Sequence, residues 1–268
     1  MDDPPIVSPP SSSITTAKVV FLMADYGHDP TETAVPYTMF KGTNYEIKFA
    51  TETGKAPRCD KKMLEGFTQK LLGAKKDVVA LYKKMAASDE MRHPLAWSDP
   101  AFSLDPFDVV VLPGGHDKAM RQIIESAALH RHLLAYFPQT RKPAGRKVVA
   151  AICHGVLVLA NARDGEGRSV IRDCLTTTLP AKMEQAAYWG TRAFLGDYYK
   201  TYGAGSEDVE HSVTKALGHP AQFKSSLNPG PFVVEDEKYN YISARYPGDA
   251  QLFAEEIVKL LESFNRIQ

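Results

Sequence analysis

The chain has 268 residues, and its 32 Lys and Arg residues balance its 32 Asp and Glu residues, so the formal net charge is zero. A balanced charge provides no electrostatic footprint for nucleic acid or an anionic membrane, and we expect neither as a partner. No apolar run approaches the ~20 residues that a membrane helix needs. Hydrophobic residues make up 44% and charged residues 24%, as in ordinary globular proteins with a full core.

The first residues, MDDPPIVSPPSSSITT, are acidic and rich in Pro and Ser, and they lack the apolar segment of a secretory signal. We interpret residues 1–16 as a flexible arm. Three cysteines, Cys59, Cys153 and Cys174, form an odd set without a CxxC pair. This pattern argues against a disulfide framework or a zinc ribbon and favours a reducing compartment, so we expect a cytoplasmic protein.

Short apolar stretches rich in β-branched residues predict buried strands. These stretches are residues 17–24 (AKVVFLMA), 45–51 (YEIKFAT), 108–115 (DVVVLPGG) and 147–152 (KVVAAI). Helical patterns lie between them, up to Phe40, over 66–87, over roughly 118–136 and from Cys153 onward. Near the end, a short strand and turn over 239–247 precede a last helix, which Asp249 can cap. One face of that helix carries Phe253, Ile257, Leu260, Leu261 and Phe264.

Continuous apolar strands that alternate with helices indicate an α/β fold with a mostly parallel sheet covered on both faces. We find no internal repeat and no clean linker, so we expect one domain over residues 17–268. Two stretches depart from the alternation, and we expect insertions near 58–97 and 185–231. The second is rich in aromatic and charged residues and is interpreted as a helical excursion beside the site.

Three motifs follow predicted strands, at the edge where open α/β sheets bind their ligands. The first is D-P-T-E-T with Glu32, the second is L-P-G-G-H with Gly114 and Gly115, and the third is A-I-C-H-G with Cys153 and His154. Because parallel strands bring their carboxyl ends to the same edge, the three motifs are expected to share one crevice.

A strand that runs through Cys153 directly into a helix has the pattern of a nucleophile elbow. A helix N-terminus favours the thiolate and lowers the thiol pKa, although a lone cysteine is more often a plain core residue. The same helix end disfavours a charged His154, so a neutral ring able to accept a proton is expected. Neighbouring helix residues splay apart, so His154 also fits a simple first-turn residue.

Glu32 has two interpretations. Asp29, Pro30 and Glu32 resemble a helix capping box, which the spacing alone favours. Alternatively, Glu32 points toward Cys153, and the two acids share a proton. The P-G-G turn likewise has two interpretations: it simply ends the strand, or it supplies a backbone N–H that stabilises an oxyanion. It lacks the motifs of a phosphate-binding loop.

With E-T-A-V-P from Glu32, V-V-L-P-G-G-H ending at His116 and A-A-I-C-H-G around Cys153, the chain resembles the PfpI/ThiJ family. That family includes the Parkinsonism-associated deglycase, glyoxalase III and related heat-shock chaperones. The resemblance covers residues 17–163. It implies a flavodoxin-like three-layer α/β/α sandwich, often a homodimer, that needs neither a metal nor another cofactor.

The resemblance also implies roles for particular residues. Cys153 is the expected nucleophile, and Glu32 is the carboxylic acid that touches its sulfur. The loop of Gly114, Gly115 and His116 is the expected oxyanion or binding segment, with the backbone N–H groups of Gly115 and His154 facing the oxyanion. In the glyoxalase III and chaperone branch a downstream acid orients the histidine. Glu184 is the candidate here, and the alternative for it is a solvated helix residue.

The reaction implied by the resemblance is of the glyoxalase III type. Cys153 adds to the aldehyde of a small 2-oxoaldehyde such as methylglyoxal, His154 or Glu32 moves protons between adjacent carbons, and water releases the 2-hydroxy acid. A cysteine hydrolase or hydratase acting on another small electrophile is one alternative. A redox-sensing or chaperone-like stress protein is another. A glutaminase is excluded, since none of the eight histidines begins the required late His-x-Glu pair.

Overall fold

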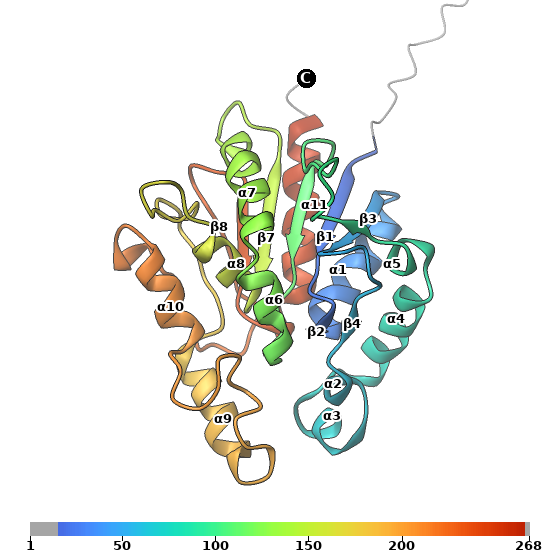
Figure 1. Cartoon of the computed structure of the whole chain (residues 1–268), viewed down its shortest axis with the longest axis vertical. Helices are drawn as coiled ribbons and strands as arrows, with labels where there is room; N and C mark the ends of the chain where they lie inside the picture. Colours follow the sequence, from blue (N-terminus) through green and yellow to red (C-terminus); the bar gives the residue numbers. More distant parts are fainter. Residues whose placement is uncertain (1–15, 266–268) are drawn as a thin grey trace, which may run out of the picture.

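The computed structural model describes residues 16–265, so the arm expected over residues 1–16 lies outside the described residues except for Thr16. Its centre is a seven-stranded sheet with the order β5-β3-β1-β6-β7-β9-β8 (Figure 1). All neighbouring strands are parallel except the edge pair β8 and β9. The strands are β1 (Lys18–Leu22), β3 (Glu46–Thr51), β5 (Leu95–Ala96), β6 (Val109–Leu112), β7 (Val148–Ile152), β8 (Val233–Glu235) and β9 (Tyr241–Ala244).

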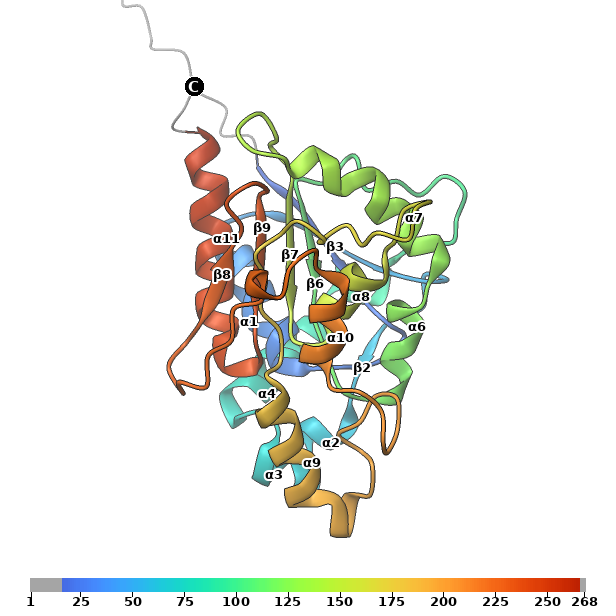
Figure 2. The ribbon, with the colours of Figure 1, turned by 90° about the vertical axis from the view of Figure 1, so that its left-hand side faces the viewer.

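Successive residues of each central strand pack against opposite layers of helices, because side chains alternate along a strand. Val20 and Leu22 of β1 face one core, whereas Val19 and Phe21 face the other. The first core is closed by α6 (Arg121–Ile124), α7 (Ala127–Tyr136), α8 (Gly155–Asn161) and α10 (Val209–Ala216). The second is closed by α1 (Pro30–Gly42), α4 (Lys76–Ala86), α5 (Asp89–Arg92) and α11 (Ala250–Asn265). Figure 2 shows α11 and α7 on opposite sides of the strands, which confirms the flavodoxin-like three-layer sandwich.

Parts of the two stretches expected as insertions extend from one end of the molecule, whereas their helices α4, α5 and α10 belong to the layers that cover the sheet. The first contains β4 (Arg58–Cys59), α2 (Lys61–Leu64) and α3 (Gly66–Leu72), and the second contains most of α9 (Ala181–Leu195). Both views place α2, α3 and α9 at the same end, where β1 finishes (Figures 1 and 2). Strand β4 pairs with β2 (Tyr26–His28) in a separate two-stranded sheet. The stretch over 58–97 also supplies β5, an edge strand of the main sheet that the sequence did not predict.

Two predicted helices are broken in the structure. The helix expected over 66–87 is divided at Gly73, because the chain turns there and the N–H of Ala74 donates to the carbonyl of Met63. The helix expected over roughly 118–136 is divided before Ser126, whose side chain caps α7 by accepting from the N–H of Leu129. Four short 3-10 helices complete the described chain, and they are η1 (Lys118–Met120), η2 (Phe137–Thr140), η3 (Pro220–Gln222) and η4 (Pro247–Asp249).

The last helix buries the apolar face that was predicted for it, with Phe253 and Ile257 fully buried against the sheet. Asp249 lies directly before α11, but its carboxylate is engaged elsewhere. The Arg245 guanidinium donates to both carboxylate oxygens, and the backbone N–H groups of Arg245 and Phe232 donate to them as well. Asp249 therefore forms a buried ion pair that holds the segment before β8, instead of the helix cap that we expected.

Within residues 16–265, no helix is long and apolar enough to cross a membrane.

The ends of β6 and β7 approach each other so closely that only glycine fits at the start of α8. A Cβ atom on Gly155 would lie 2.0 Å from the carbonyl oxygen of Leu112 and 3.0 Å from that of Pro113. These are rigid backbone atoms, so the clash cannot be relieved by a side-chain rotation. Gly155 thus allows the loop after β6 to lie against the loop after β7.

We predict that Gly155→Ala lowers the free energy of unfolding by about 1–3 kcal/mol, as overpacking in a tight core does. Gly190→Ala is the matched control, because Gly190 is an exposed residue inside α9 with no atom within 4 Å of its added Cβ. Alanine is the better helix former, so the control should melt at or above the wild-type temperature. Thermal melts of the two variants make the comparison, and a Gly155→Ala protein as stable as wild type would contradict the prediction.

Candidate active site

Cys153 lies at the junction of β7 and α8 in a strained backbone conformation. Its φ is +56°, a left-handed value that non-glycine residues rarely adopt. Hydrogen bonds fix the residue on both sides, since its N–H donates to the carbonyl of Ala244 over 3.0 Å and its carbonyl accepts from Thr178 Oγ1 over 2.7 Å. Such strain persists only where the surroundings determine the geometry, and it is concentrated at functional sites.

The carboxyl group of Glu32 crosses from the start of α1 to the loop after β6. Its Oε2 accepts from the backbone N–H of Gly114 over 2.8 Å. Asp29 is the N-cap of α1, with Oδ1 accepting from the N–H groups of Thr31 and Glu32. The N–H of Asp29 donates to the carbonyl of Gly114, so Glu32 does not complete a capping box. The interpretation that the spacing favoured is therefore wrong for the Glu32 side chain, although the Asp29 cap is present.

Neighbouring atoms leave no room for a side chain at Gly114 or Gly115. A Cβ on Gly114 would lie 2.7 Å from the backbone nitrogen of His154 and 2.8 Å from Glu32 Oε2. Gly115 has a φ of +150°, and its Cβ would lie 2.2 Å from the carbonyl oxygen of Gly27. The loop after β6 is thus wedged between α1 and the nucleophile elbow, which brings all three sequence motifs to one place.

Glu32 and Cys153 form a coupled acid pair. Glu32 is fully buried, and its Oε1 has no conventional hydrogen-bond partner among the described residues. Burial, followed by the charge of Asp29, holds the pKa of Glu32 well above its usual range, so this carboxyl group keeps its proton. Burial also raises the pKa of Cys153, as do the negative charges that Glu32 and Asp29 carry when ionised. A hydrogen bond from the backbone N–H of His154 lowers this pKa by less. The helix N-terminus, which we expected to lower this pKa, is outweighed in the enclosed site.

His154 contacts the sulfur directly. Its Nδ1 lies 3.3 Å from Cys153 Sγ, although the two residues are adjacent in sequence. Their side chains meet because His154 precedes α8, whose first residue is Gly155. Burial, and then the positive charge of Lys200, lowers the pKa of His154 to about 3. The ring is therefore neutral at physiological pH and can accept the thiol proton.

Glu184 is buried near this group, but its partner is Lys200 and not His154. Lys200 Nζ lies 3.0 Å from Glu184 Oε1, and the N–H of Val209 donates to Oε2 over 2.8 Å. Lys200 also pairs with Asp208. The two carboxylates raise the pKa of Lys200 against the effect of burial, so the lysine stays charged. Glu184 is thus neither the acid that orients His154 nor a solvated helix residue.

The loop between α9 and α10 (residues 196–208) covers the site from the side of His116. The Tyr199 ring lies 4.4 Å from the His116 ring between centroids, and the Tyr198 ring meets His116 edge-on at 4.5 Å. Thr201 Oγ1 donates to the carbonyl of His116 over 2.8 Å. Asp60, which precedes α2, accepts from the Tyr198 hydroxyl. The two inserted stretches therefore meet over the loop after β6.

Sequence reasoning missed Lys200 and Asp60, because neither residue stands in a motif or on a predicted strand end.

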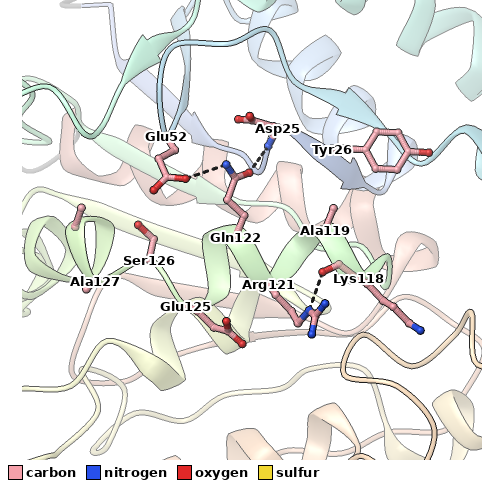
Figure 3. Close-up of a pocket in the computed structure, with 11 residues that line it drawn as sticks. Asp25, Tyr26, Glu52, Lys118, Ala119, Arg121, Gln122, Glu125, Ser126 and Ala127 are labelled. Carbon is pink, nitrogen blue, oxygen red and sulfur yellow. Dashed lines mark hydrogen bonds between the residues drawn. The ribbon is translucent and has the colours of Figure 1, made fainter.

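The thiol is enclosed. Cys153 is 6% exposed, His154 1% and Glu32 0%. The hollow shown in Figure 3 lies elsewhere, between Asp25, Glu52 and the helical segment that begins at Lys118. Gln122 spans that hollow, accepting from the N–H of Asp25 and donating to Glu52. A second hollow reaches Asp60 and Lys62. Neither hollow is lined by Cys153 or His154, and no group of three or more His, Cys, Asp or Glu side chains within residues 16–265 could hold a metal ion.

The raised pKa of Glu32 predicts the direction in which stability changes with pH. The folded protein holds this proton more tightly than the unfolded chain, so its contribution is full below the unfolded pKa and is lost as pH rises through the folded pKa. Glutamine has no such proton. The melting temperature of Glu32→Gln relative to wild type should therefore increase from about pH 5 to about pH 9.

Paired thermal melts across that pH range measure this difference. A capping role for Glu32 would instead lower the melting temperature of the variant. A difference that stayed constant or decreased with pH would contradict the buried, protonated carboxyl group.

Comparisons with known proteins identify similar sequences and similar folds. Uncharacterized protein C14C4.04 of Schizosaccharomyces pombe is 29% identical over 252 residues, which cover 92% of this chain and 85% of that protein. Among solved structures, the Rapid Encystment Protein 24 KDa of Francisella tularensis is 21% identical with a TM-score of 0.63, covering 92% of this chain and 99% of that one. Glyoxalase III from Candida albicans is 17% identical with a TM-score of 0.64, covering 91% and 97%.

These two structures share the fold. The family model described as ThiJ/PfpI family-like matches residues 23–241, a range that contains Glu32, Cys153 and His154. The chain is therefore a member of the ThiJ/PfpI family.

Proposed function

We propose that this protein converts a small 2-oxoaldehyde, such as methylglyoxal, to the corresponding 2-hydroxy acid with Cys153 as its nucleophile. The observation that supports the proposal most strongly is the 3.3 Å contact between Cys153 Sγ and Nδ1 of a neutral His154, beside a buried and protonated Glu32. The proposal assigns Cys153 as the nucleophile, His154 as the base and Glu32 as the acid around one atom. The likeness of the fold to glyoxalase III from Candida albicans is consistent with this chemistry.

The first step forms a carbon–sulfur bond. The thiol proton of Cys153 passes to His154 Nδ1 as the sulfur attacks the aldehyde carbon, and a proton then reaches the new oxygen to give a hemithioacetal. The backbone N–H of His154 donates a hydrogen bond to the Cys153 sulfur, and Glu32 can supply a proton. The neutral state of His154 is essential, because an imidazolium could not accept the thiol proton.

The remaining steps move two protons and add one water. A base removes the proton from the carbon that carries the sulfur, and a proton returns to the neighbouring carbon, which was the ketone. The hydroxyl proton of the hemithioacetal is likewise replaced by a proton on the former ketone oxygen. The product is the thioester of the 2-hydroxy acid. Water then cleaves the carbon–sulfur bond, releases the acid and restores the thiol. The aldehyde carbon is oxidised and the ketone carbon is reduced, so the reaction needs no external oxidant or reductant.

His154→Ala should reduce lactate formation from methylglyoxal by at least about 100-fold, the usual contribution of a general base. Peroxide oxidation of Cys153 in the same variant should slow less than lactate formation, because oxidation needs His154 only to form the thiolate and requires no proton transfer between carbons. Cys174→Ala is the control, since Cys174 is also buried but has no histidine at its sulfur among the hydrogen bonds of the described chain.

Lactate assays and mass spectrometry of the Cys153 peptide provide the two measurements. Wild-type protein that formed no 2-hydroxy acid from methylglyoxal or glyoxal would overturn the proposed function. Peroxide oxidation of Cys153 in that same protein would then favour the redox-sensing alternative.

A further inference from the structure

Three buried polar atoms next to the Cys153–His154 pair lack hydrogen-bond partners in the described part of the chain. They are His154 Nε2, His116 Nε2 and the hydroxyl of Tyr199. The nearest acid to His116 Nε2 is Asp60 Oδ2 at 3.7 Å, which is too long for a hydrogen bond. Buried polar groups in native proteins are nearly always bonded, so three neighbouring exceptions require an explanation. A small polar ligand is the simplest one.

The three side chains come from separate segments; His116 contacts Tyr199, and His154 lies close enough to His116 to lower its pKa. His116 follows β6, His154 follows β7, and Tyr199 belongs to the loop between α9 and α10. The rings of His116 and Tyr199 are in contact, with 4.4 Å between their centroids and 31° between their planes. His154 bonds the sulfur through Nδ1, so its unpartnered Nε2 lies on the other edge of the ring. A ligand at Nε2 would be next to a molecule attached to the sulfur.

The electrostatic character of this group is neutral to negative. Burial lowers the pKa of both His116 and His154 to about 3, and burial raises that of Tyr199 to about 12. Lys200 is the buried cation beside them, and Glu184 and Asp208 already pair with it. Lys62 is exposed and lies over the Tyr198 ring at 4.3 Å. Asp29 and Asp60 add carboxyl groups near the tyrosine.

We propose that His116, His154 and Tyr199 form a subsite for an uncharged carbonyl or hydroxyl oxygen, and that this subsite excludes carboxylates. A neutral oxygen can accept from the tyrosine and from a ring N–H. A carboxylate would lose its hydration without gaining a buried, unpaired cation, because Lys200 is paired with two carboxylates and Lys62, whose charge reaches His116, is exposed to solvent; this loss is strongly unfavourable. If the proposed function holds, the oxygen is the ketone of the 2-oxoaldehyde. The preference for uncharged ligands does not depend on that reaction.

Iodoacetamide and iodoacetate test the charge preference without turnover. Both alkylate a thiol, but only iodoacetamide presents an uncharged carbonyl group. The rate of Cys153 alkylation by each is followed by peptide mapping, and their ratio is divided by the ratio for the same protein unfolded in urea. Both reagents are used at concentrations where the alkylation rate is proportional to reagent, so a rapid opening equilibrium of the enclosed site precedes both reactions and its equilibrium constant cancels in the ratio. We expect a normalised preference of at least about tenfold for iodoacetamide, the equivalent of roughly 1.4 kcal/mol.

Tyr199→Phe removes the hydroxyl group and keeps the ring that contacts His116. This change should slow alkylation by iodoacetamide severalfold and leave iodoacetate nearly unaffected. Tyr202→Phe is the matched control, because Tyr202 lies in the same loop, is 45% exposed and bonds Glu125. A normalised ratio near one, a preference for iodoacetate, or equal effects of the two tyrosine changes would overturn the subsite.

A turnover assay connects the subsite to the reaction. For methylglyoxal, Tyr199→Phe should reduce kcat/KM about tenfold, and glyoxylate should be neither a substrate nor an inhibitor at comparable concentration. Absence of turnover in the wild type would count against the proposed function alone, because the alkylation ratio would still report the subsite. Efficient turnover of glyoxylate would count against the subsite alone.

Discussion

The structure of the site depends on one buried carboxyl group. Glu32 accepts the N–H of Gly114 through Oε2 and interacts with the Cys153 thiol, so it links the start of α1 to the loops after β6 and β7. Three other features make this link possible. Asp29 starts α1 at the right place, Gly114 and Gly155 let the loops approach, and the left-handed conformation of Cys153 directs its side chain from the end of β7.

Burial then determines the protonation states, and these determine the chemistry. Glu32 keeps its proton and both histidines stay neutral, because a charge in this enclosed volume would lose its hydration. The one buried cation, among the charged groups described around the site, is balanced by two carboxylates. Such a site is suited to transferring protons among neutral groups and an uncharged substrate. It is poorly suited to binding an anion, which is why the charge of the ligand is a sensitive probe of it.

Much of the architecture could be predicted from the sequence. The apolar strands around Val20, Val110 and Val149 are continuous because both faces of a parallel sheet are buried, and the motifs at their ends mark the edge where the site forms. Edge strands β5 and β8 were missed, since strands of two and three residues carry almost no periodic signal. The helix breaks were missed as well, because they depend on local capping by residues such as Ser126.

The covering of the site could not be predicted. Asp60 and Tyr198 meet across 138 positions of sequence, and Lys200 is placed beside His154 only by the tertiary fold. The family resemblance suggested Glu184 as a partner for the histidine, but Lys200, which belongs to no sequence motif, pairs with both Glu184 and Asp208. The position of the cysteine between strand and helix can therefore be predicted from its local sequence motif, whereas the charges around it depend on contacts between distant segments.

The most direct test of the central claim is to detect the covalent intermediate on Cys153. Protein mixed with methylglyoxal is quenched at short times, and the Cys153 peptide is analysed by mass spectrometry while lactate is measured in parallel. The account predicts an adduct on Cys153 that appears and decays as lactate forms in the wild type, and that forms much more slowly in His154→Ala. Lactate formation with Cys153 unmodified throughout, or with adducts confined to lysine and arginine side chains, would contradict it.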